Sequence, residues 1–178
     1  MKKRTLTIAV GLTLMAGLLL ITGTASAQAI KTPIEGNWLA PARLWPPERE
    51  WVDEDGILHV RNQKFRSRHG GGDIEGREIG WESRDVDLAA GLMSGHGYNY
   101  FIGTVLGDPA EAVGRYSWEC TRIEGAWICT STHTWHVNDG SLIKFSGTVE
   151  AGVYPQPYSG IHVDTPGGES RQGPRRRR

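Results

Sequence analysis

The sequence lacks several features that would narrow its function. It contains no Gly-x-Ser-x-Gly, no His-Glu-x-x-His, no phosphate loop and no calcium loop, which excludes the classes that depend on those motifs. Beyond the N-terminal apolar run, no stretch of helical periodicity is long enough for a structural helix. An excess of basic residues is missing from residues 28–168 as well, since they hold 12 basic and 19 acidic side chains. No nucleic-acid partner is therefore expected for the folded part, because such a surface needs clustered lysine and arginine.

The first 27 residues predict an export signal. Lys2, Lys3 and Arg4 form a positive end, residues 8–21 are apolar, and residues 25–27 form a small-residue cleavage site. Cleavage there leaves a secreted or periplasmic chain of 151 residues with no transmembrane segment, which is the size of one domain. An uncleaved membrane anchor is the alternative, although the apolar run is short for a bilayer core about 30 Å thick.

The chain has only two cysteines, and turn geometry brings them together. If Glu124 and Gly125 form a two-residue turn, counting outward places Cys120 opposite Cys129 in a β-hairpin. The two residues then form a non-hydrogen-bonded pair with Cα atoms about 4.5 to 5.5 Å apart, which a disulfide accepts. Export to an oxidising compartment favours that disulfide. A metal site is the alternative, and it would need histidine or carboxylate partners at the same end of the hairpin.

A second hairpin follows directly. Residues 138–140 suit a three-residue loop, which sets Trp135 opposite Ile143 and His133 opposite Phe145. The other face of this three-stranded unit is mostly polar, so the unit is expected to cover a core on one side and to meet water on the other. The predicted core face comprises Tyr116, Trp118, Cys120, Trp127, Cys129, His133, Trp135, Ile143, Phe145 and Val149.

Strands interrupted by glycines predict the rest of the fold. Residues 56–163 contain about seven antiparallel strands in sequence order, with a single helical turn expected at residues 108–112. Closure of this meander into a small barrel of about eight strands leaves few open edges, and a two-layer sandwich is the alternative. The predicted fold class is therefore all-β.

Both ends of the exported chain predict irregular structure. Residues 28–55 hold Trp38, Trp45 and Trp51 among four prolines, so most of this segment is expected to be irregular or to form an edge, wrapped on the core. Residues 164–178 are expected to be disordered. The tail ends in four arginines, which are expected either to contact an anionic surface weakly or to be solvated: Arg175, Arg176, Arg177 and Arg178.

The hairpin lengths, glycines and cysteine pair form a pattern that comprises residues 116–121, Gly125, residues 127–130, residues 139–143 and Gly147. Over roughly residues 95–160 it resembles the dirigent and allene oxide cyclase group of calycin-type, eight-stranded β-barrels, in particular its bacterial secreted members of unknown function. The resemblance implies an apolar cavity that binds, and in some members cyclises or couples, small hydrophobic molecules without a metal or an organic cofactor. In that group a glycine-rich stretch leads into a last barrel strand, whereas this chain has only residues 165–168 there. The last strand must then come from elsewhere, or the resemblance fails at that end.

His133 is the main candidate for chemistry. On the predicted register it points inward between Tyr116 and Phe145, where burial would lower its pKa and keep it neutral. A neutral imidazole beside a cavity can act as an acid, a base or an orienting donor, and a hydrogen-bonded core histidine is the alternative. Ligand-binding candidates, each of which also suits a core or a half-buried strand, are Tyr98, Tyr100, Tyr116, Trp118, Trp135 and Phe145.

Three functions are compatible with these features. The first is a secreted β-barrel that binds a small hydrophobic or aromatic molecule without a cofactor. The second is a cofactor-independent cyclase or isomerase in which His133 assists proton transfer. The third is an extracellular interaction or inhibitor module with a solid core. A cavity of about 300 Å³ or more would favour the first two functions over the third.

Overall fold

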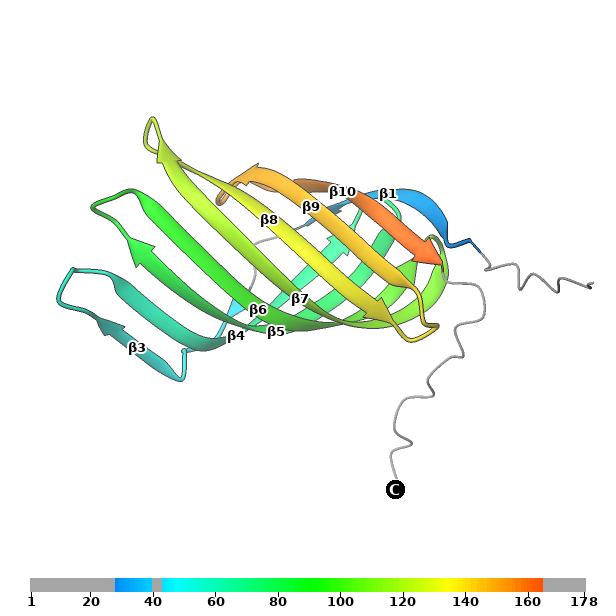
Figure 1. Ribbon diagram of the computed structural model, residues 1–178, viewed down its shortest axis with the longest axis horizontal. Coiled ribbons are helices and arrows are strands. Elements are labelled where there is room, and N and C mark those ends of the chain that lie inside the picture. Colours follow the sequence, from blue (N-terminus) through cyan, green and yellow to red (C-terminus); the bar gives the residue numbers. More distant parts are fainter. Residues whose placement is uncertain (1–27, 40–42, 165–178) are drawn as a thin grey trace, which may run out of the picture.

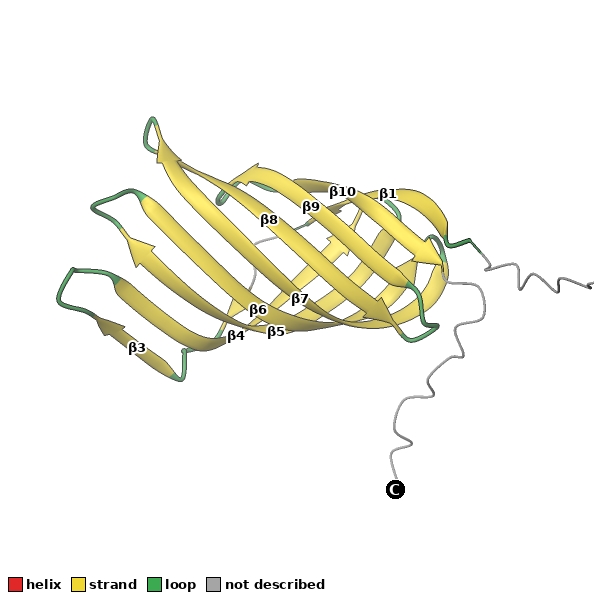
Figure 2. Ribbon diagram, viewed as in Figure 1, coloured by secondary structure: helices red, strands yellow, loops and turns green. Residues whose placement is uncertain are grey.

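A computed structural model describes residues 28–39 and 43–164, so the predicted export signal and most of the basic tail lie outside the described residues. The described part is built of strands joined by turns (Figure 2), and it contains no helix that could cross a membrane. In chain order the strands are β1 (Ile30–Trp38), β2 (Arg43–Leu44), β3 (Arg49–Val52), β4 (Leu58–Gly70), β5 (Ile74–Asp87), β6 (Leu92–Val105), β7 (Asp108–Ile123), β8 (Ala126–Val137), β9 (Leu142–Glu150) and β10 (Gln156–Asp164).

Eight strands form a closed ring. Strands β4 to β10 are antiparallel neighbours in sequence order, and β1 pairs with both β10 and β4. The pairing of β1 with β4 is short, with Asn37 opposite Gly70 and Trp38 opposite His69. The ring is uneven, because the β3–β4, β5–β6 and β7–β8 hairpins extend beyond it at one end, which we call the hairpin end (Figure 1). The predicted all-β meander, closed into a barrel of about eight strands, is confirmed.

The first predicted hairpin has the expected register. Cys120 lies opposite Cys129, and their sulfur atoms form a disulfide with the Cα atoms 4.0 Å apart. Glu124 and Gly125 have φ angles of 51° and 90°, as a two-residue turn with positive φ at both positions requires. The disulfide is compatible with an oxidising compartment, and export itself stays a prediction.

Removal of this disulfide should have a moderate effect on stability. Combining Cys120→Ser with Cys129→Ser should lower the free energy of unfolding by about 2 kcal/mol, because the two residues are only 9 positions apart and the turn already restricts the unfolded chain. Urea unfolding followed by tryptophan fluorescence measures the change. Wild-type protein reduced with dithiothreitol should unfold at the same urea concentration as the variant. A variant as stable as oxidised wild type would contradict the prediction.

The second predicted hairpin is confirmed too. Trp135 lies opposite Ile143, and His133 lies opposite Phe145. The first two residues are fully buried, His133 is 7 % exposed and Phe145 is 3 % exposed. Gly140 has a φ of 91° in the connecting turn, which suits glycine. Turn chemistry and alternation thus placed the aromatic face of β7, β8 and β9 toward the interior.

Large aromatic rings inside the barrel lie over glycines on neighbouring strands. At each of these glycines a Cβ atom would collide with the ring opposite, so only glycine lets the ring approach the backbone so closely. The rings therefore lie directly against the inner surface of the sheet. The opposed pairs are Tyr158 and Gly36, Phe65 and Gly80, Trp118 and Gly95, Tyr116 and Gly97, and Trp135 and Gly114.

The N-terminal segment differs from its prediction, since β1 is a full strand of the ring. It pairs with β10 along its whole length despite Pro33. The backbone N–H of Glu35 donates to Asp73 Oδ2, and the backbone N–H of Asp73 donates to the Glu35 carbonyl. The backbone N–H and C=O groups of Glu35 therefore point away from β10. Pro33 lies two residues before Glu35, so its backbone nitrogen also points away from β10. Its lack of an N–H therefore costs no hydrogen bond to β10. Strand β1 thereby supplies the closure for which the sequence offered no late strand.

The helical turn expected at residues 108–112 is also wrong. These residues begin β7, and the preceding turn consists of Leu106 and Gly107. Their φ angles of 53° and 89° fit a second two-residue hairpin turn, which leaves no room for a helical turn.

The three tryptophans of the N-terminal segment have different surroundings. Trp38 lies inside the barrel, with its ring centroid 4.8 Å from that of Tyr158. Trp45 is half-buried beside the Lys64 ammonium, 5.4 Å from the indole centroid. Trp51 on β3 is 39 % exposed. Only Trp38 contributes to the interior.

Charged side chains hold β3 to the sheet at the hairpin end. The His59 ring lies between two carboxylates, with Nε2 2.8 Å from Asp53 and Nδ1 2.6 Å from Asp85. These hydrogen bonds raise the pKa of His59. Arg61 pairs with Asp85 at 2.7 Å, and Trp51 stacks on His59 with ring centroids 4.9 Å apart. This cluster fastens neighbouring strands on the outside of the ring.

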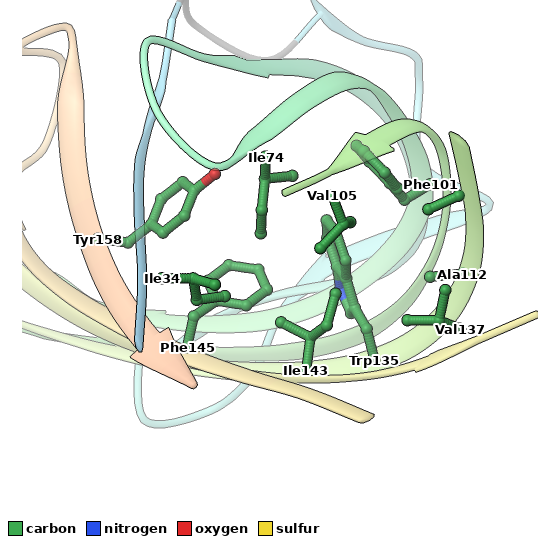
Figure 3. Close-up of a cluster of buried hydrophobic side chains, with 11 residues drawn as sticks. Ile34, Ile74, Phe101, Val105, Ala112, Trp135, Val137, Ile143, Phe145 and Tyr158 are labelled. Atoms are coloured by element: carbon green, nitrogen blue, oxygen red, sulfur yellow. The ribbon is translucent and has the colours of Figure 1, made fainter. Parts of the chain in front are cut away.

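Buried apolar side chains fill the other end of the barrel (Figure 3). They come from β1, β5, β6, β7, β8, β9 and β10 and leave this end solid. We call it the closed end. The cluster comprises Ile34, Ile74, Phe101, Val105, Ala110, Ala112, Trp135, Val137, Ile143, Phe145 and Tyr158.

Candidate functional site

A cavity of about 280 Å³ lies inside the barrel on the side of the hairpin end. Its floor includes Ser67, Glu78 and His133, which project inward from β4, β5 and β8. Its volume is at the lower end of the range of small-molecule sites, about 300 to 1,000 Å³. Five aromatic side chains form much of its wall: Trp38, Phe65, Tyr116, Trp118 and Tyr154.

A buried carboxylate organises the floor of the cavity. Glu78 is 2 % exposed, and its Oε2 accepts hydrogen bonds from Ser67 Oγ at 2.7 Å and from His69 Nε2 at 2.8 Å. The amide nitrogen of Asn99 donates to the other oxygen, Oε1. Burial alone would raise the pKa of Glu78, but the hydrogen bond from His69, the charge interactions with His69 and His133 and the hydrogen bond from Ser67 together outweigh it and lower the pKa to about 2. Glu78 is therefore ionised at neutral pH.

The network continues from Glu78 to β10 through His69. The Nδ1 atom of His69 lies 3.2 Å from the hydroxyl of Tyr158. Burial raises the pKa of Tyr158, so its phenol stays protonated and can donate. If Tyr158 donates to Nδ1 and Nε2 donates to Glu78, these hydrogen bonds link β10, β4 and β5 through the ring of His69.

A second carboxylate, Glu82, holds two aromatic side chains of the cavity wall. Its Oε2 accepts hydrogen bonds from Trp118 Nε1 at 2.9 Å and from the Tyr116 hydroxyl at 3.2 Å. Its Oε1 accepts a hydrogen bond from Arg84 at 3.0 Å. Burial and the charge of Glu82 raise the pKa of Tyr116, which keeps the phenol a donor. These contacts fix the orientation of the indole and the phenol toward the cavity.

His133 lies where the sequence predicted it. Its ring stacks between Tyr116 and Phe145, with centroid distances of 5.3 Å and 4.5 Å and interplanar angles of 13° and 11°. Burial lowers the pKa of His133 to about 4, so the imidazole is neutral at pH 7. Its Nδ1 atom has no hydrogen-bond partner among the described residues. His133 therefore offers an unused polar atom in the floor region.

The other predicted ligand-binding residues divide into three groups. Tyr116 and Trp118 line the cavity. Trp135 and Phe145 are packed in the apolar cluster and are absent from the cavity wall. The remaining two, Tyr98 and Tyr100, face outward.

Tyr98 and Tyr100 are 53 % and 38 % exposed, which corrects the expectation that they line an interior cavity. The inward positions of β6 have the opposite parity and are occupied by glycines and by Met93, Asn99, Phe101 and Val105. On the outside, Tyr98 stacks on Trp81 with ring centroids 5.2 Å apart. Both tyrosines border a broad hollow of the outer surface, about 760 Å³ in volume.

Sequence reasoning missed the two acids of the cavity. On β5, Glu78 and Glu82 share the parity of Ile74 and Val86, both buried, and this pattern is the signal that could have placed them inside. The outward-facing positions of the same strand were more conspicuous, because they include Trp81. The short connection at residues 71–73 sets Ser67 on β4 opposite Glu78, so counting outward from this turn is a second local signal that could have brought these residues together.

The described residues contain no group of three or more histidine, cysteine, aspartate or glutamate side chains placed to hold a metal ion. Comparison of the chain with protein-family models, with curated proteins and with solved structures found no match. The resemblance to the dirigent and allene oxide cyclase group therefore stays a prediction, and the site has to be interpreted from its own geometry.

Proposed function

We propose that the protein binds a small, largely apolar or aromatic molecule in the cavity inside its barrel. The observation that carries this proposal is an interior cavity with aromatic walls and a polar floor. Such a combination of apolar surface and a few convergent polar groups is typical of ligand sites. A solid-core interaction module would not need that space.

Binding without catalysis fits the titratable groups of the floor. A general acid or base works best with a pKa near the working pH. The pKa of Glu78 is lowered to about 2 and that of His133 to about 4, so both are weak bases at neutral pH. Their positions suit the orientation of a ligand better than proton transfer to it.

The interior cavity is a better candidate site than the outer hollow beside Tyr98. The outer hollow is bordered by side chains of β5 to β8 on one face of a continuous sheet. The cavity is bordered by side chains from β1, β2, β4, β5, β7, β8, β9 and β10 and from the β9–β10 connection, so they surround it from several directions. Enclosure on several sides buries more ligand surface.

A cavity-filling substitution tests the proposal. Ser131 lines the cavity from β8, and Thr130, its neighbour, is exposed on the outer face. Ser131→Trp should weaken binding of the neutral fluorescent dye N-phenyl-1-naphthylamine at least about tenfold, whereas Thr130→Trp should bind it like wild type. Dye fluorescence titrations measure both, and near-UV circular dichroism shows whether each variant is folded. Equal dye binding by a folded Ser131→Trp variant would refute an interior site.

A further inference from the structure

We propose that the outer face of the sheet, where β4 to β8 lie side by side (Figure 1), docks on a membrane surface that contains anionic lipids. This inference concerns a second site, on the outside of the barrel, and it is independent of the cavity. Three features of the outer face support it: a continuous patch of exposed apolar side chains, a surplus of cations around that patch, and the kinds of apolar side chain in it.

Exposed apolar side chains meet at the centre of this face. Tyr100 on β6 has Ile79 opposite it on β5 and Val113 opposite it on β7. Tyr98 and Ile102 lie two residues before and after Tyr100 on the same strand. All five side chains are at least 37 % exposed. Neighbouring strands are about 4.8 Å apart, so these residues form one continuous apolar surface, which we call the outer patch.

Basic side chains surround the outer patch. The strand register places six of them on the same outer surface, beside the patch or one strand further. All six are exposed, and in the described part of the chain none of them takes part in an ion pair. Two carboxylates, Glu75 and Glu111, share this surface, which leaves a surplus of positive charge. The basic residues are Arg43, Lys64, Arg66, Arg68, Arg77 and Arg115.

This surplus favours an anionic occupant. A second copy of the chain is a poor occupant, because contact between two such faces would bring their positive charges together. An anionic surface instead attracts each cation that reaches it. Residues 28–168 as a whole hold more acidic than basic side chains, so it is the strand register that gathers these cations on one face.

The apolar side chains suit a lipid surface better than a sugar or a nucleic-acid base. Stacking on a sugar or a base needs an open ring face. Trp81, however, lies between Tyr98, with ring centroids 5.2 Å apart, and Lys64, whose ammonium is 5.7 Å from the indole centroid. The aliphatic side chains of the outer patch offer neither a ring face nor a hydrogen bond. Aromatic and aliphatic side chains beside lysine and arginine are typical of surfaces that lie at a membrane–water interface.

Strand β6 provides a matched comparison. Leu92, near its other end, is 50 % exposed, as Ile102 is. Leu92 lies beside a hollow that is also lined by Asp85, Asp87 and Glu119. An anionic surface would be repelled there. The two residues therefore have equal exposure on one strand but surroundings of opposite charge.

A fluorophore at each of these two positions tests which surface meets the lipid. The native cysteines form a disulfide, so a single new cysteine can be labelled with the environment-sensitive dye acrylodan. With vesicles of phosphatidylglycerol and phosphatidylcholine in equal parts, dye emission should shift to the blue for Ile102→Cys and stay unchanged for Leu92→Cys. Phosphatidylcholine vesicles should shift neither. Both labels are compared in the full chain, so residues outside the described part contribute equally. No shift at Ile102, or an equal shift at both positions, overturns the inference.

Two matched pairs of substitutions separate charge attraction from contact with lipid. In co-sedimentation with the anionic vesicles, Arg115→Glu should weaken binding at least about tenfold, and Arg122→Glu, near the other end of β7, less than about twofold. Ile102→Asn should weaken binding about fivefold, and Leu92→Asn should have no effect. All four side chains are exposed, so each variant should fold like wild type, which near-UV circular dichroism checks.

The same variants distinguish a membrane from a soluble polyanion. Equal effects within either pair of substitutions overturn the inference. Polygalacturonate and single-stranded DNA are the competing occupants, and both should bind wild type more weakly than the anionic vesicles do. If either polymer binds more tightly than the vesicles and binds Ile102→Asn as well as wild type, the partner of this face is an anionic polymer and the membrane inference is wrong.

Discussion

Replacing Trp135 with alanine should lower the free energy of unfolding by about 4 kcal/mol. The indole is fully buried and stacks on Phe101, with ring centroids 4.7 Å apart. It also meets Phe145 edge to face at 4.9 Å and lies against the backbone of Gly114. These neighbours belong to strands that are hydrogen-bonded within the ring, so they cannot collapse into the space that alanine would leave.

Urea unfolding of wild type and of Trp135→Ala measures this change. Trp51→Ala is the matched control, because Trp51 is 39 % exposed on β3 and its loss should cost less than about 1 kcal/mol. Similar losses of unfolding free energy for the two variants would contradict the prediction that Trp135 contributes strongly to the packing of the closed end.

Acidification should destabilise the protein in a window set by Glu78. The pKa of this carboxyl is lowered from 4.5 in the unfolded chain to about 2 in the folded protein, so the unfolded state binds the proton first as the pH falls. The stabilising contribution is complete above pH 4.5 and is lost as the pH falls through about 2. Since one pKa unit corresponds to about 1.4 kcal/mol, the loss attributable to Glu78 is about 3 kcal/mol.

The titration of His133 changes the free energy of unfolding in a higher pH range, so its effect can be separated from that of Glu78. Its pKa is lowered from 6.5 to about 4, so its contribution is complete above pH 6.5 and declines as the pH falls through about 4. Below about pH 4 the remaining slope should come largely from Glu78 and other carboxyls with lowered pKa values.

The free energies of unfolding of wild type and Glu78→Gln, measured between pH 7 and pH 2, test the assignment. The variant should be about 3 kcal/mol less stable at pH 7, because Ser67 and His69 lose a charged acceptor, and the difference should shrink toward pH 2. Glu75→Gln should follow the wild-type curve, since Glu75 is exposed. A constant difference at every pH would mean that Glu78 is not ionised in the folded protein.

Local rules were sufficient to predict the two hairpins formed by β7, β8 and β9. The disulfide between Cys120 and Cys129 and the stack of Tyr116, His133 and Phe145 both follow from turn lengths and strand alternation. Consecutive antiparallel strands joined by tight turns have their register set by the turn, so counting residues places each side chain. The same rules failed for Tyr98, because glycines and Asn99 occupy the inward positions of β6 next to it, so the outward parity carries the more conspicuous aromatic residues there.

The sequence by itself determined the all-β class, the cysteine pair and the inward face of β7, β8 and β9. Only the tertiary structure decided that β1 closes the ring and that His69 on β4 meets Tyr158 on β10. The physical reason is the range of the interactions. Turn chemistry acts over a few neighbouring residues, whereas ring closure and the contact between His69 and Tyr158 depend on strands that are far apart in the chain and meet only when the barrel is complete.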